Sequence, residues 1–248
     1  MNKNEIILGD AYKLIKDVPD KSIDLIVTDP PYLIEGWHTG TGMLKEHNMS
    51  YTKELMEQEE TLLKGIDKSI LDEFVRVMKK INCYIWCSKE QILPIGNYFA
   101  GKGCSFNILV WCKTNVMPLA HNTFLPNLEY CLVLREAGTK LNNDIKWKSK
   151  WYCSQTNVND KKAFNHPTIK PLELVKRHLM HSTVEGSVVL DPFIGSGTTA
   201  VACKELGRQY IGFEIDENYW KIAKARVEGV KKIVRNGDDM VFEQLGLF

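Results

Sequence analysis

The sequence predicts an α/β domain built on a mostly parallel, doubly wound β-sheet. Three observations indicate this fold. The chain has 248 residues, of which 44% are hydrophobic and 25% charged, as in one large globular domain. Short apolar runs of strand length alternate with segments whose apolar residues recur three and four positions apart. The runs are nearly uninterrupted, which is typical of parallel strands that helices cover on both faces.

The predicted elements follow one another regularly along a single domain, residues 1–248. Strands are expected at residues 5–10, 22–29, 82–88, 106–113, 129–136, 187–192 and 208–216, and helices at residues 69–81, 171–183, 198–207 and 217–230. Two polar stretches, 33–65 and 136–165, break the alternation, and such long loops in a compact domain usually carry function. We expect both to leave the sheet without joining it, 33–65 as a mobile loop or helix segment. Residues 237–248 are expected to form a C-terminal tail.

Composition and charge exclude several classes of protein. No apolar run approaches the roughly 20 residues that span a bilayer, and no basic apolar leader is expected. The net charge is +1, so a nucleic-acid surface would have to be a local patch. Cys83 and Cys87 share a face of a predicted strand, but the ligand spacing of a zinc site is missing. We therefore expect no metal, and small buried thiols in a reducing cytosol.

The strand predicted at 22–29 runs into an unusual corner, "TDPPYLI", at residues 28–34. Pro30 and Pro31 donate no backbone hydrogen bond, so they end the strand. Pro31 also forces Pro30 into an extended conformation, which makes the corner stiff. Taken alone, the corner is equally compatible with an ordinary end of a strand.

A second motif, "VVLDPFIGSGTTAVACKELGRQYIGFEID", occupies residues 188–216. A strand runs into Asp191, a glycine turn follows, and the next strand ends at Glu214, whose carboxylate can accept from two ribose hydroxyls. The turn also matches the G-x-G-x-x-A fingerprint of dinucleotide-binding proteins, so a nicotinamide enzyme is an alternative. Asp191, however, would repel a pyrophosphate and suits a ligand with an ammonium group.

Together the two motifs resemble those of the amino-methylating DNA methyltransferases that use S-adenosylmethionine. The order, with the catalytic motif before the cofactor motif, is that of the permuted, or beta, class of the adenine-N6/cytosine-N4 family. A third stretch, "HPTIKPLELVKRHLM" at 166–180, resembles the one that precedes the cofactor strand in that family. The resemblance implies a Rossmann-like methyltransferase fold with a circularly permuted motif order. It implies an enzyme of DNA methylation, alone or within a restriction-modification system.

The corner would be the catalytic motif of such an enzyme. The resemblance implies that Asp29 and the carbonyl of Pro30 accept the N–H groups of a base amine, and that Pro31 keeps this carbonyl aimed. Tyr32 would stack on the base once it has flipped out of the duplex. An initial aspartate is more typical of adenine-N6 enzymes; cytosine-N4 enzymes commonly have serine there, and glutamine-modifying relatives have asparagine. Cytosine-N4 remains an alternative, as does a DNA-binding module that has lost catalysis.

The resemblance also implies a set of cofactor contacts. Asp191 and the turn at 193–197 would hold the methionine end of S-adenosylmethionine, Glu214 the ribose, and Asp10 the adenine amine. Thr168 and Lys170 would reach the cofactor carboxylate. The implied cofactor-binding residues are Asp10, Ala11, Thr168, Lys170, Asp191, Phe193, Gly195, Ser196, Gly197, Thr198 and Glu214. Alternatives remain open at two positions: Asp10 as a plain helix cap, and Lys170 as a solvated lysine.

Recognition of double-stranded DNA is expected from the insertion at 136–165. Residues 140–162 contain six lysines and two aspartates, a local charge of +4, with aromatic residues between them. Lysines can neutralise phosphates while aromatic rings wedge beside a flipped base. The nucleic-acid-binding residues implied are Lys146, Trp147, Lys148, Lys150 and Trp151. A solvated loop with structural tryptophans is the alternative, and RNA is not excluded as the substrate.

The tail ends in Gln244-Leu245-Gly246-Leu247-Phe248. An apolar terminus needs a pocket, either in its own domain or in a partner. The stretch resembles the short peptide by which bacterial proteins bind the replicative sliding clamp, although Gly246 replaces the usual serine or aspartate. The resemblance implies a bacterial or bacteriophage host, and we expect a cytoplasmic enzyme that is either a monomer or a homodimer.

Overall fold

The computed structural model describes residues 1–32, 65–116, 124–164, 169–230, 232–236 and 239–243. The strands are β1 (Glu5–Leu8), β2 (Leu25–Thr28), β3 (Asn82–Cys87), β4 (Ser105–Lys113), β5 (Leu128–Arg135), β6 (Trp151–Ser154), β7 (Val188–Asp191), β8 (Gln209–Glu214), β9 (Lys232–Asn236) and β10 (Asp239–Glu243). The α-helices are α1 (Ala11–Leu14), α3 (Lys68–Val77), α4 (Ile92–Ala100), α5 (Val158–Phe164), α6 (Leu172–Ser182), α7 (Thr198–Glu205) and α8 (Glu217–Glu228). Two 3₁₀ turns, η1 (Ile15–Asp17) and η2 (Ile145–Trp147), complete the described elements.

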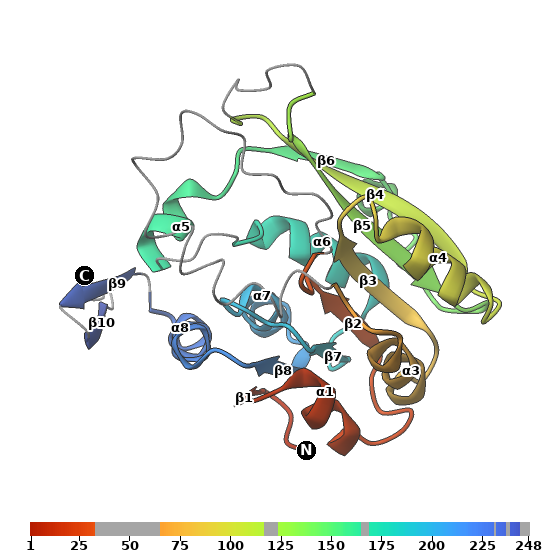
Figure 1. The fold of residues 1–248 in the computed structure, drawn as a ribbon, viewed down its shortest axis with the longest axis horizontal. Helices are drawn as coiled ribbons and strands as arrows, with labels where there is room; N and C mark the ends of the chain where they lie inside the picture. Colours follow the sequence, from red (N-terminus) through yellow and green to blue (C-terminus); the bar gives the residue numbers. More distant parts are fainter. Residues whose placement is uncertain (33–64, 117–123, 165–168, 231, 237–238, 244–248) are drawn as a thin grey trace.

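One sheet of eight strands organises the molecule (Figure 1), in the order β1-β8-β7-β2-β3-β5-β4-β6. Neighbouring strands are parallel except where β5 pairs antiparallel with β3 and β4. The prediction of a mostly parallel α/β sheet is therefore confirmed.

The sheet has a topological switch point between β2 and β7. From β2 the chain crosses by α3 to β3 on one side, and from β7 it crosses by α7 to β8 on the other. Connections that leave two adjacent parallel strands in opposite directions open a crevice at their carboxyl ends, where α/β proteins place ligands. The two motifs found in the sequence follow these two strands.

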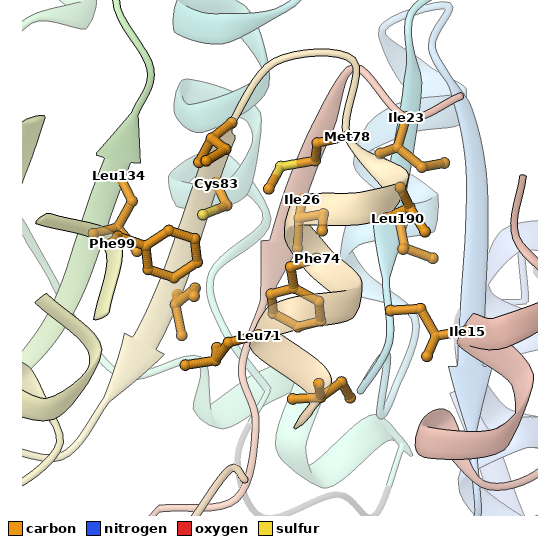
Figure 2. Close-up of a cluster of buried hydrophobic side chains, with 14 of the residues drawn as sticks. Ile15, Ile23, Ile26, Leu71, Phe74, Met78, Cys83, Phe99, Leu134 and Leu190 are labelled. Carbon is orange, nitrogen blue, oxygen red and sulfur yellow. The ribbon is translucent and has the colours of Figure 1, made fainter. Parts of the chain in front are cut away.

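Helices cover both faces of the sheet because its strands are apolar on both sides. On one face, α1, α3 and α4 bury a cluster that includes Ile15, Phe74 and Phe99. Figure 2 shows Phe74 of α3 among strand residues of this cluster such as Ile26 and Leu190. On the opposite face, α6, α7 and α8 pack on alternate strand residues such as Leu25, Val27, Tyr84, Trp86 and Val189. This double cover explains the uninterrupted apolar runs.

Two expectations about single elements are wrong. The segment 136–165 does join the sheet, since β6 pairs with β4 as a parallel edge strand and η2 and α5 flank it. The helix predicted at 69–81 ends at Val77, because Met78 adopts an extended conformation and pairs with Ile23. Part of the expected tail forms a hairpin of β9 and β10, which follows α8 along the chain (Figure 1). Residues 33–64 and 244–248 lie outside the described residues.

The cysteines mostly follow the prediction. Cys83 and Cys87 lie in the same buried cluster, on one face of β3, and all seven thiols are free. Cys153, in contrast, is exposed, because it lies on the edge strand. Within the described part of the chain, no helix has the length and apolar character needed to cross a bilayer.

Candidate active site

Four carboxylates follow four neighbouring strands at one edge of the sheet. Asp10 follows β1, Glu214 ends β8, Asp191 ends β7, and Asp29 follows β2. These strands are parallel and adjacent, so their carboxyl ends meet at the same edge. The corner at residues 28–32 and the glycine turn therefore form one site, although most of the chain lies between them.

Asp191 joins the two motifs through hydrogen bonds. Its Oδ1 accepts from the Thr28 hydroxyl at 2.9 Å, and its Oδ2 accepts from the Thr199 hydroxyl at 2.6 Å. The Phe193 amide also donates to Oδ1, at 3.2 Å. Asp191 is 4% exposed, and burial raises its pKa to about 7 even though these donors act to lower it. Its described contacts tie β2, β7 and α7 together; the predicted contact with a ligand ammonium stays a prediction.

The glycine turn is fixed by its neighbours on α8. Gly197 has a φ of +82°, and a Cβ at this position would lie 2.9 Å from the Ala223 backbone. Arg226, buried beneath the turn, donates to the Ser196 carbonyl at 2.6 Å and to the Thr198 hydroxyl at 3.1 Å. Ser196 and Thr198 therefore hold the turn in place, a role that the sequence did not indicate.

Glu214 and Asp10 also anchor the backbone at this edge. Glu214 Oε2 accepts from the Gly195 amide at 2.8 Å, and Oε1 accepts from the Asp216 amide at 2.9 Å. Burial raises the pKa of Glu214. Asp10 accepts from the Tyr12 amide at 2.9 Å as the N-cap of α1, and its predicted contact with the cofactor adenine stays a prediction.

Three side chains border this part of the edge. The ring of Phe193 meets the Tyr12 ring edge-on, with 6.4 Å between centroids, and Ala11 is buried at the start of α1. Tyr12 was not predicted, since nothing in its short segment distinguishes it from a surface residue. Thr168 lies outside the described residues.

The chemistry of this edge can be tested against the ligands that the sequence suggests. Asp10, Asp191 and Glu214 offer hydrogen-bond acceptors and negative charge around the turn. Such a set repels a pyrophosphate and attracts a ligand that carries a sulfonium and an ammonium group. The residues present therefore fit S-adenosylmethionine better than a dinucleotide.

The corner after β2 is braced from two sides. The Tyr32 hydroxyl donates to Asp29 Oδ1 at 2.9 Å, so the tyrosine and the aspartate act as one unit. Gln91, 4% exposed before α4, donates to the Pro31 carbonyl at 3.3 Å and accepts from the Ser88 amide at 3.0 Å. Buried glutamine of this kind gives no signal in the sequence, because the corner that it braces is remote along the chain.

Lys170 extends this unit, in a position that the sequence did not predict. Its Nζ lies 2.5 Å from Asp29 Oδ2 and 3.3 Å from the Tyr32 hydroxyl. It also lies 2.9 Å from Glu129 Oε2 and 5.0 Å from the centroid of the Trp86 ring. Lys170 is 9% exposed, so the alternative of a solvated lysine is wrong. Its described partners at short distance include Asp29 and Tyr32 of the corner, and the predicted contact with the cofactor carboxylate stays a prediction.

The charges at the corner depend on one another. Burial raises the pKa of Asp29, and the adjacent Lys170 ammonium offsets part of that rise. Burial acts to raise the pKa of Glu129 too, yet Lys170 and Lys113 lower it to about 2. For Lys170, burial acts to lower the pKa, but Asp29, Tyr32 and Glu129 raise it well above its usual value. Lys170 and Glu129 are therefore ionised at neutral pH.

The lysine-rich segment at residues 140–162, called the basic segment below, lies over the face of the sheet that α6 covers. Lys146 pairs with Asp144 at 3.1 Å and lies over the Trp147 ring, and Trp151 is 63% exposed. A cavity of about 210 Å³ lies between this segment, the sheet and α6, and its lining includes Trp147, Lys148, Lys150, Trp151, Arg135 and Arg177. Trp86 lines the cavity too and lies beneath Lys170, which connects the segment to the corner.

Among the residues that the structure describes, no group of three or more histidine, cysteine, aspartate or glutamate side chains is placed to hold a metal ion.

Comparisons with known sequences agree with this geometry. A family model described as DNA methylase matches residues 23–225. The Type II methyltransferase M2.DpnII of Streptococcus pneumoniae is 32% identical over 250 residues, covering 92% of this chain and 91% of the relative. The Type II methyltransferase M2.LlaDCHI of Lactococcus lactis subsp. cremoris is 31% identical over 240 residues, covering 90% and 88%.

Solved structures of DNA methyltransferases are also similar to this chain. The crystal structure of an M1.HpyAVI–SAM complex is 26% identical, has a TM-score of 0.67, and the match covers 90% of this chain and 98% of that one. The cytosine-N4-specific PvuII DNA methyltransferase has a TM-score of 0.68 at 15% identity, covering 90% and 86%, which shows a shared fold.

The tightness of the glycine turn can be tested by stability. Gly197→Ala should lower the free energy of unfolding by about 1–2 kcal/mol for the left-handed conformation and by roughly 1–3 kcal/mol more for crowding against Ala223. Urea denaturation of the wild type and the variant measures the sum of the two losses. Gly229→Ala is the matched control, since Gly229 has a φ of +99° but no atom near its missing Cβ. Equal losses in the two variants would show that Ala223 does not constrain the turn.

Proposed function

The chain belongs to the family of DNA methylases that its sequence matches from residue 23 to 225, and on that premise we propose that it methylates the exocyclic N6 amine of adenine in double-stranded DNA. It is an enzyme that takes its methyl group from S-adenosylmethionine. One observation carries the proposal of methyl transfer at this site: the corner Asp29-Pro30-Pro31-Tyr32 lies directly beside the glycine turn, through the Thr28–Asp191 hydrogen bond.

The proposed chemistry needs acceptors for the amine. An exocyclic amine is a weak nucleophile, because its lone pair is delocalised into the ring. Asp29 and the Pro30 carbonyl would accept its two N–H groups, localise the lone pair and stabilise the positive charge that develops on nitrogen. Since burial raises the pKa of Asp29, its carboxylate can also hold the proton that the methylated amine releases. The target base has to leave the stack to reach this corner.

The cofactor supplies an electrophilic methyl group on a sulfonium. In our proposal Glu214 accepts from the ribose hydroxyls, because its oxygens keep lone pairs beyond the two backbone donors. Asp191 supplies negative charge for the ammonium end, beside the turn from Phe193 to Gly197. Asp10 and Ala11 flank the adenine ring of the cofactor. Asp10 accepts a hydrogen bond from the amine of this ring while it caps α1.

The proposal of adenine rests on the first residue of the corner. Asp29 gives the Asp-Pro-Pro-Tyr form typical of adenine-N6 enzymes, and its carboxylate is a stronger acceptor than the serine common in cytosine-N4 enzymes. Cytosine-N4 methylation uses the same two acceptors, so product analysis on both bases decides between them.

DNA binding is proposed for the segment around η2 and β6. Lys146, Lys148 and Lys150 supply positive charge, Trp147 and Trp151 supply rings, and Arg177 adds a charge from α6 beside the same cavity. Lysines on such a surface neutralise phosphates, whereas aromatic rings can wedge beside an unstacked base. The support is the combination, in one segment, of positive charge with the exposed ring of Trp151 and the half-buried ring of Trp147.

We also propose that residues 244–248 attach the enzyme to the replicative sliding clamp in the cytoplasm of a bacterium or of a phage-infected cell. The support is the peptide itself and the bacterial origin of the relatives. Leu247 and Phe248 would fill an apolar cleft, and Gln244 would hydrogen-bond at its side.

The catalytic assignment predicts a separation of binding from chemistry. Asp29→Ala should lower the rate of methyl transfer to DNA by roughly 10²-fold or more while S-adenosylmethionine affinity, measured by calorimetry, stays near that of the wild type. Glu214→Ala is the reciprocal control and should weaken cofactor affinity. Turnover near the wild-type level in the Asp29 variant would remove it from the catalytic role. A wild type that binds the cofactor but transfers no methyl group would favour the catalytically silent alternative.

The DNA-binding assignment predicts a change in salt dependence. Neutralising Lys146, Lys148 and Lys150 together should weaken DNA binding. The slope of log K against log salt should fall by about 0.9 for each phosphate that the segment no longer neutralises. Neutralising the exposed lysines Lys3, Lys16 and Lys21 gives a control of equal charge. The same slope in both triple variants would assign the segment a structural role only.

The clamp assignment predicts that removing the tail abolishes clamp binding and leaves activity on DNA intact. Deleting residues 244–248 should abolish retention on immobilised clamp while methylation of naked oligonucleotides stays unchanged. The paired substitution of Leu247 and Phe248 by alanine should act in the same way. Unfolding, or loss of activity on oligonucleotides, would instead show that the tail packs on its own domain.

A further inference from the structure

Charged side chains alternate across the carboxyl edge of the sheet. Lys113 Nζ lies 2.6 Å from Glu129 Oε1, Glu129 Oε2 lies 2.9 Å from Lys170 Nζ, and Lys170 Nζ lies 2.5 Å from Asp29 Oδ2. The four side chains are between 9% and 27% exposed. Glu129 is thus the only described carboxylate besides Asp29 that pairs with Lys170.

This row poses an electrostatic problem for the proposed reaction. Transfer of a methyl group to a neutral amine places positive charge on the amine nitrogen, next to Asp29. Lys170 already places a full positive charge 2.5 Å from that carboxylate. At such distances in a partly buried site, an unbalanced cation would oppose the developing charge and would weaken Asp29 as an acceptor.

We propose that Glu129 is a positioning residue for methyl transfer, which holds Lys170 and balances its charge so that Asp29 stays a strong acceptor for the amine. The inference rests on the proposed function of Asp29. Glu129 belongs to neither motif and reaches the corner because β5 runs antiparallel to β3, which brings the first residues of β5 to the carboxyl edge.

The sign of the coupling follows from the groups around Asp29. Lys170 lowers its pKa, and the negative charge of Glu129 raises it. The ionisable groups that interact with Asp29 come from several elements: Tyr32 of the corner, Cys87 of β3, Glu129 and Cys131 of β5, Lys170 before α6, and Asp191 of β7. Removing the charge of Glu129 therefore lowers the pKa of Asp29 and leaves Lys170 paired with Asp29 alone.

Two substitutions at residue 129 separate charge from shape. Glu129→Gln keeps the size and removes the charge, and should lower kcat roughly tenfold to hundredfold, with a small change in the KM for S-adenosylmethionine. The acid limb of its pH–rate profile should move to lower pH, because activity needs ionised Asp29. Glu129→Asp shortens the side chain but keeps the charge, and should retain more activity than Glu129→Gln.

The matched control is Glu73→Gln, which removes a partly buried ion pair with Arg76 on α3, distant in the fold from the corner. It should leave kcat and the acid limb unchanged. A higher kcat for Glu129→Gln than for Glu129→Asp, or an acid limb that does not move, would overturn the inference. Circular dichroism and urea denaturation confirm that each variant is folded.

A direct measurement of the pKa of Asp29 distinguishes a failure of this inference from a failure of the proposed function. Carboxyl ¹³C NMR titration of the full chain, with the Asp29 signal assigned through Asp29→Asn, measures the pKa of Asp29 without turnover. Glu129→Gln should lower this pKa, and an unchanged or raised value would overturn the coupling whatever the substrate. If the wild type shows the coupling but does not methylate adenine, the proposed substrate fails and the charge balance stands.

Discussion

The buried carboxylate of Asp191 is the contact on which the site depends. It accepts hydrogen bonds from Thr28 on β2 and Thr199 on α7, so it fixes the end of one strand against the end of another and against the helix that follows. A carboxylate with 4% exposure is costly unless its oxygens are satisfied, and these donors satisfy them. The arrangement makes the spacing between the Asp29 corner and the glycine turn a property of the core, with little contribution from loops.

The permuted order of the motifs becomes understandable in these terms. Since β2 and β7 are hydrogen-bonded neighbours, the order in which the chain visits them does not alter the edge that they form together. The edge requires only that each strand is followed by its own crossover helix, α3 after β2 and α7 after β7, on opposite faces of the sheet. The methylase fold can therefore place its catalytic motif before its cofactor motif and keep one site.

The sequence predicted the parts of the structure that local pattern controls. The strands at 82–88, 187–192 and 208–216 were identified from apolar runs, and the corner and the turn from proline and glycine. The helix α4 was missed because Pro94 and Gly96 weaken its helical signal. The strand β6 was missed because it is only four residues long and lies within a polar, lysine-rich segment. Lys170 was assigned to a ligand, since only the fold shows that it faces Asp29.

The direction of β5 explains why the site holds more than the motifs reveal. In a fully parallel sheet, Glu129 would lie at the amino edge, far from Asp29. From the sequence alone, a glutamate at the start of an apolar strand is interpreted as an ordinary surface residue. Pairing antiparallel to β3 and β4 brings it to the carboxyl edge, beside the last residue of β4, Lys113. Strand direction depends on contacts between remote segments, so no local pattern contains it. One reversed strand thus supplies the negative charge that lets a buried lysine lie beside Asp29, the aspartate that we propose as catalytic.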